Sequence, residues 1–83
     1  MLAVVHWVPH PGVYITEELE ARGWLPRDLA YRLHVPEQTV TRLLAGAPLS
    51  AALALALAEA FATDHEFFVH LQQAYDRAHA GEV

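Results

Sequence analysis

The chain has 83 residues, 54% of them apolar, which suits one domain with one core and excludes a disordered segment. It contains no cysteine, which excludes disulfide and thiolate chemistry, and no stretch reads as a membrane span or a signal peptide. Ten acidic residues against five arginines and no lysine give a net charge of −5, which leaves few groups to neutralise DNA phosphates. We therefore expect a cytoplasmic protein without membrane contact.

The N-terminal residues lack the helical spacing of apolar residues that the rest of the chain shows. Residues 2–8 are apolar and β-branched, and they end at a break that contains Pro9, Pro11 and Gly12. The pattern predicts a short extended N-terminal arm over residues 1–10, one helical domain over residues 11–80, and a tail over residues 81–83. Two roles remain open for the arm, namely a cover for the core and a dimer contact.

Three short helices are predicted in the first half of the domain, over residues 11–22, 26–33 and 36–45. A proline stands at the first position of the first and third segments, which suits a helix start. Gly23 and Gly46 follow the first and third segments and predict where they end. Helical spacing then directs one set of side chains inward: Ile15, Leu19, Leu29, Ala30, Leu33, Val40, Leu43 and Leu44.

Two further helices are predicted in the second half, over residues 51–62 and 65–80. The first alternates Leu and Ala, but both residues are strong helix formers, and Ser50 suits its N-cap. Asp64 or Thr63 suits the N-cap of the second, and the spacing of Thr63 and Glu66 also fits a capping box. That helix carries one wide apolar stripe: Phe67, Phe68, Leu71, Ala74, Tyr75 and Ala78.

The second and third predicted helices are joined by a turn too short for an antiparallel pair, so we expect them to cross steeply as a helix-turn-helix. The outer face of the third helix then faces solvent and carries Gln38, Thr39, Thr41 and Arg42. Gln pairs well with adenine, Arg with guanine, and Thr with a methyl group or a phosphate. These four residues are the predicted DNA-reading set.

Six short motifs over residues 10–76 carry a family resemblance through their order and spacing: His10-Pro11-Gly12, Glu17-Glu18-Leu19, Arg27-Asp28-Leu29-Ala30-x-Arg32-Leu33, Pro36-Glu37-Gln38-Thr39-Val40, Gly46 and Phe67-Phe68-x-x-Leu71-Gln72. They resemble the HigA-type antitoxins, which belong to the wider XRE, or lambda-repressor-like, group. The resemblance implies an all-α, five-helix domain that dimerises and binds a palindromic operator. In many members it also implies neutralisation of a co-encoded ribonuclease toxin.

Two function hypotheses follow. The first is a homodimeric, sequence-specific repressor of the antitoxin type on double-stranded DNA. Gln38 and Arg42 would read bases, and Arg27 and Arg32 would hold phosphates. The second is a protein-binding module on the same fold with little or no DNA binding, either toxin-neutralising or a phage-type antagonist of a host factor.

Departures from the family pattern motivate the second hypothesis. Leu25 and Pro26 stand where members usually carry Ser or Thr followed by Gln, and neither side chain caps the helix. His34 stands where glycine is common, and Ala47 and Pro48 stand where a basic residue is usual. Several phosphate contacts of the family are therefore absent.

The sequence supports neither a metal site nor an enzyme active site. His65 and His70 are five residues apart, whereas the zinc motif of the metalloproteases has its two histidines four apart on one helix face. We find no nucleophile with a paired base and no glycine-rich phosphate loop, so we expect neither an enzyme, nor a metal site, nor a cofactor.

Overall fold

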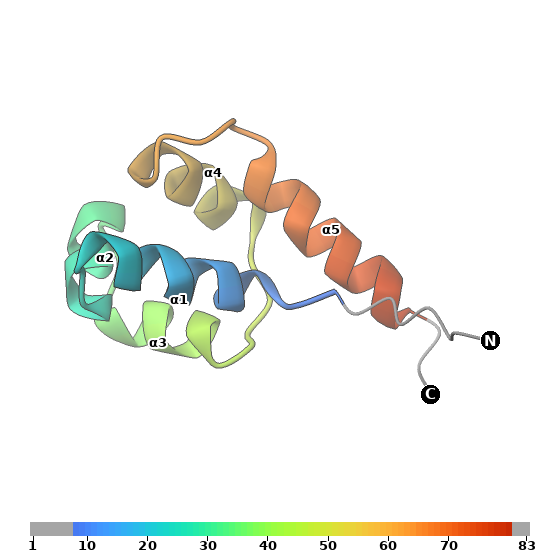
Figure 1. Cartoon of the computed structure of the whole chain (residues 1–83), viewed down its shortest axis with the longest axis horizontal. Helices are drawn as coiled ribbons and strands as arrows, with labels where there is room; N and C mark the ends of the chain where they lie inside the picture. The colour runs from blue at the N-terminus through green and yellow to red at the C-terminus, as the bar shows by residue number, and fades with distance from the viewer. Residues whose placement is uncertain (1–7, 81–83) are drawn as a thin grey trace.

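The computed structural model describes residues 8–80, which form five α-helices and no strand. In chain order these are α1 (Pro11–Arg22), α2 (Pro26–Leu33), α3 (Glu37–Leu44), α4 (Ala51–Ala60) and α5 (Phe67–His79), shown in Figure 1. The all-α class is confirmed. The predicted arm, apart from residues 8–10, and the predicted tail over 81–83 lie outside the described residues. Within residues 8–80, no helix has the length and hydropathy that crossing a membrane requires.

The core gathers one apolar face from each helix. Every inward-facing residue predicted for α1, α2 and α3 is buried except Leu44, which is half-buried. The Leu and Ala alternation of α4 is helical as predicted, because the helix buries Ala54, Leu57 and Ala58 on one side. In α5 only Phe68 is fully buried. The outer part of its predicted apolar stripe is therefore only partly covered.

Two side chains cap helix starts. Ser50 caps α4 as predicted, since its hydroxyl accepts a hydrogen bond of 3.2 Å from the backbone N–H of Leu53. His10 caps α1, because its Nδ1 accepts from the backbone N–H of Gly12 at 2.9 Å. The sequence pattern does not predict this second cap, because histidine is not among the usual N-cap residues.

Two helix starts were predicted wrongly. Pro36 is the N-cap of α3, with extended backbone, rather than its first helical residue. The predicted capping box before α5 is absent, because the Thr63 hydroxyl donates to the carbonyl of Asp64 at 3.3 Å. A turn closed by the Phe67 N–H and the Asp64 carbonyl takes the place of the first helical turn, so α5 begins two residues later than predicted.

The end of α4 was also predicted too late. Ala62 has a φ of 57°, in the left-handed region that the helix does not use. The next N–H, of Thr63, bonds back to the carbonyl of Ala58 at 2.8 Å, which completes a Schellman-type end. The helix therefore stops at Ala60 and the chain turns toward α5.

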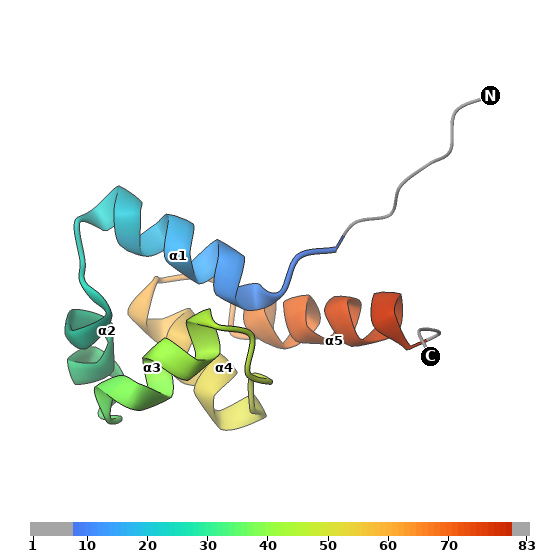
Figure 2. The same ribbon diagram turned by 90° about the horizontal axis from the view of Figure 1, so that it is seen from below.

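The views in Figures 1 and 2 show how the helices surround the core. The short α2 lies at one end of the molecule, and the axis of α5 leads away from the other helices toward the opposite end. Where α5 extends, Tyr75 packs edge-on against His10, with ring centroids 5.0 Å apart. α3 is packed against α1 and α2, which leaves its remaining side free.

Candidate nucleic-acid interface

The turn between α2 and α3 sets the angle of the candidate reading helix. His34, at the end of α2, has φ 59° and ψ 42°, and its N–H bonds to the carbonyl of Tyr31 at 3.2 Å. The N–H of Val35 then bonds to the carbonyl of Ala30 at 3.1 Å. The left-handed conformation of His34 thus changes the direction of the chain, so that α3 crosses α2 (Figure 2). The helix-turn-helix geometry expected from the sequence is present.

Because His34 holds a left-handed backbone, we expect His34→Gly to raise the free energy of unfolding by about 0.5–1 kcal/mol. Glycine has no side chain to be strained in the left-handed conformation. This gain is larger than the cost of the greater conformational entropy that glycine has in the unfolded chain. The matched control is His70→Gly within α5, where glycine should instead destabilise by about 0.5–1 kcal/mol. Urea denaturation of both variants measures the difference. Equal losses in the two variants would show that the turn carries no such strain.

The outer face of α3 is open to solvent. Gln38, Thr41 and Arg42 are exposed, whereas Val40 and Leu43 on the opposite side are buried. The Thr41 hydroxyl donates a hydrogen bond of 3.0 Å to the carbonyl of Gln38, within the same helix. Its methyl group can still contact a ligand. Arg42 makes no hydrogen bond or ion pair with any residue between 8 and 80. Its guanidinium is free for an external acceptor.

Thr39 occupies a different position from the other three residues. It is half-buried and lines a shallow hollow of about 330 Å³ together with Leu53 and Ser50 at the start of α4. The structure therefore groups Gln38 and Arg42 with Thr41 and places Thr39 at the border with α4.

The start of α2 is capped in an unexpected way. The Leu25 side chain makes no cap bond, but the carboxylate of Asp28 accepts from the Leu25 N–H at 2.8 Å. An acidic residue three positions into the helix is the signal that predicts such a bond. Arg27 beside it is exposed and has no hydrogen bond or ion pair within residues 8–80. One cation is thus free at this end of α2, next to a carboxylate that repels phosphate.

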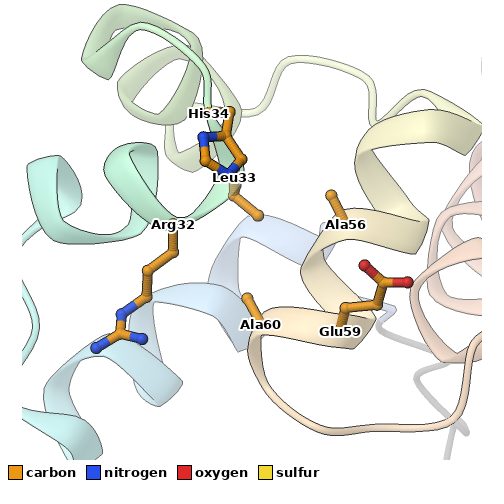
Figure 3. A pocket seen from close by; sticks show the side chains of 6 residues that line it. All are labelled: Arg32, Leu33, His34, Ala56, Glu59 and Ala60. Carbon is orange, nitrogen blue, oxygen red and sulfur yellow. The ribbon is translucent and has the colours of Figure 1, made fainter.

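Arg32 is not brought together with the other predicted site residues. Its guanidinium lies 4.1 Å from the centre of the Trp24 ring, within cation–π range. It also borders a hollow of about 420 Å³ whose other side is α4, including Glu59 and Ala60 (Figure 3). The Arg32 guanidinium is thus engaged by Trp24, in the segment between α1 and α2, and not by a residue of the outer face of α3.

The charged residues Arg22 and Glu18 of α1 interact with other residues of the domain. Arg22 pairs with Glu18 at 3.1 Å and donates to the carbonyl of Phe61 at 3.3 Å. Burial, together with the nearby Glu18 carboxylate, raises the pKa of Tyr14, which therefore stays neutral under ordinary conditions. Two of the five arginines, Arg22 and Arg32, are thus engaged within the molecule.

A solved structure of an addiction module antidote protein of the HigA family from Coxiella burnetii superposes with a TM-score of 0.77 and 33% sequence identity. The match covers 92% of this chain and 95% of that one. The chain belongs to the HigA family.

A second protein is similar to the chain over most of its length. Virulence-associated protein A' from Dichelobacter nodosus is 34% identical over 76 residues, which is 89% of this chain. The chain spans 66% of the length of that protein. No protein-family model matches the chain.

No metal site accompanies the HigA-type helix-turn-helix in the part of the chain that the structure describes. Residues 8–80 contain no group of three or more His, Asp or Glu side chains placed to hold an ion. His70 instead approaches Glu66 at 3.4 Å along the exposed side of α5.

Proposed function

We propose that this HigA-family chain is an antitoxin that also represses transcription, by placing the outer face of α3 in the major groove of an operator. The observation that carries the proposal is the exposed set Gln38, Thr41 and Arg42 on a helix that crosses its predecessor. In helix-turn-helix proteins this second helix enters the major groove.

Each residue of the proposed interface has a chemical role. Gln38 can pair with two atoms of an adenine edge, and Arg42 with two atoms of a guanine edge. Thr41 offers its methyl group to a thymine, and Thr39 lies at the border of the groove. Arg27 would hold a phosphate. We assign Arg32 a smaller share of phosphate binding, because it is stacked on Trp24.

The scarcity of free cations favours a dimer on a palindromic site. One protomer presents few arginines to phosphates, so two reading helices on half-sites about 34 Å apart would double the contacts. We propose that the second protomer packs against the half-covered end of α5, where Leu71, Ala74 and Tyr75 are only partly buried. The N-terminal arm would be the other candidate contact.

The DNA-binding proposal is tested with DNA from upstream of the chain's own gene. We expect Arg42→Ala and Gln38→Ala each to weaken binding about 10- to 100-fold, the loss of one good base pairing. Arg77→Ala, which removes the same charge from the exposed last turn of α5, is the control and should bind like the unmodified chain.

Raising the salt concentration completes that test. The dependence of affinity on salt should be shallow, because few phosphates are neutralised. Unchanged binding in both α3 variants would remove the proposed reading face. If Arg77→Ala loses as much DNA affinity as Arg42→Ala, the affinity depends on the overall charge of the chain and not on the outer face of α3.

Toxin neutralisation is proposed as the second activity of the same chain. The relative from Coxiella burnetii is described as an addiction module antidote, and the net charge of −5 suits contact with a basic protein. We infer that a gene next to that of this chain encodes the toxin. A stable complex between the two purified products supports this role, and their failure to associate contradicts it.

A further inference from the structure

One face of α2 exposes apolar and aromatic side chains that the DNA-reading proposal does not use. Tyr31 is 82% exposed and Leu25 is 50% exposed, the two highest values among the large hydrophobic residues described. Trp24, Asp28 and Arg32 lie beside them, and a hollow of about 270 Å³ opens among four of these residues. The α2 outer face is defined here by its five residues: Trp24, Leu25, Asp28, Tyr31 and Arg32.

Part of this face is held rigidly against the core. The Trp24 ring stacks on buried Phe61 with centroids 5.8 Å apart and an interplanar angle of 21°. The guanidiniums of Arg32 and Arg22 lie 4.1 and 5.3 Å from the Trp24 centroid. Stacked side chains of this kind lose little conformational freedom when a partner binds. The part of the α2 outer face formed by Trp24 and Arg32 is therefore preorganised.

The two charges on the face differ in what they can still bind. The Asp28 carboxylate already accepts from the Leu25 N–H. The Arg32 guanidinium has no hydrogen-bond acceptor among residues 8–80, although its flat side is covered by Trp24. Its N–H groups are thus oriented for an external carboxylate, the planar acceptor that matches a guanidinium.

We propose that the α2 outer face is the surface that binds the toxin, and that the toxin presents an apolar side chain beside a carboxylate. The inference rests on the antitoxin role proposed above. The apolar side chain would enter the hollow between Trp24 and Tyr31, and the carboxylate would pair with Arg32. Trp, Tyr and Arg are the residues that contribute most to binding at protein interfaces.

Apart from Arg32, the α2 outer face offers little that DNA can bind. The backbone of DNA offers phosphates, whereas this face offers mostly aromatic and aliphatic surface and one carboxylate. Arg32 lies on α2 and borders the hollow between α2 and α4 (Figure 3), whereas Gln38 and Arg42 lie on α3. A toxin on the α2 outer face would therefore leave Gln38 and Arg42 uncovered.

The test measures binding of the full chain to the purified product of the adjacent gene. In a Trp7→Phe background, the fluorescence of Trp24 should change on binding and give the affinity directly. We expect Tyr31→Ala and Arg32→Glu each to weaken toxin binding at least 10-fold. Tyr31 is so exposed that its removal leaves the core intact, which circular dichroism verifies for both variants. Arg77→Glu is the charge-matched control and should bind normally.

Each result assigns the face differently. Normal toxin binding by both α2 variants overturns the proposed surface while the antitoxin role stands. No binding by the unmodified chain overturns the antitoxin role itself, and this inference with it. A change in oligomeric state or in DNA affinity in Tyr31→Ala, with toxin binding intact, would assign the face to a second copy or to DNA and likewise overturn the proposal.

Discussion

Replacing Phe68 with alanine is expected to lower the free energy of unfolding by about 3–5 kcal/mol. Phe68 is fully buried, and its ring packs against Tyr14, Phe61 and Phe67 with centroids 5.7, 6.0 and 5.1 Å apart. It is also the only fully buried residue that α5 contributes within the described range. Its loss leaves a cavity where α1, α4 and α5 meet, which the short helices cannot close.

Phe67→Ala is the matched control for this prediction. The two phenylalanines are neighbours in sequence, but Phe67 is only half-buried. We therefore expect Phe67→Ala to lower the free energy of unfolding by less than half as much as Phe68→Ala. Urea denaturation followed by circular dichroism measures both values. Equal losses for the two variants would contradict the assignment of Phe68 as the residue that fastens α5 to the core.

Gly12→Ala is expected to destabilise the domain by about 1–3 kcal/mol, the usual cost of an overpacked contact. A Cβ at this position would lie 2.7 Å from the carbonyl oxygen of Leu43 and 3.3 Å from the Cα of Leu44. Both are backbone atoms, which cannot rotate away as a side chain would. α1 and α3 must therefore separate, although alanine is the better helix former.

This substitution also tests how the reading helix is held. Because α3 rests on α1 at Gly12, a displaced α3 should weaken operator binding, even though Gly12 does not touch the outer face. Glu17→Ala, an exposed change on the same helix, should alter neither stability nor binding by more than a small amount. A fully stable Gly12→Ala variant would show that the two helices are free to move apart.

The helices and most of the core were predictable because their side chains repeat at helical spacing. Ile15 and Leu19, or Val40 and Leu43, face inward whatever the details of their neighbours. Helix ends depend instead on single backbone conformations. The left-handed Ala62 and the turn before Phe67 leave no pattern in the sequence, so the end of α4 and the start of α5 were misplaced.

The exposure of the candidate reading residues was predictable for the same reason, since Gln38 and Arg42 lie opposite a buried stripe. The placement of Arg32 was not. Its environment depends on Trp24, which in turn stacks on Phe61 from a distant part of the chain. Helical spacing shows only that Arg32 faces outward, not which residue it meets.

We propose that the outer face of α3 is the surface that meets operator DNA. Nuclear magnetic resonance of the ¹⁵N-labelled chain, titrated with its own upstream DNA, tests it residue by residue. The largest changes in amide and side-chain signals should fall on Gln38, Thr41 and Arg42, with a smaller effect at Arg27. Changes confined to other helices, or none at low salt, would contradict the account.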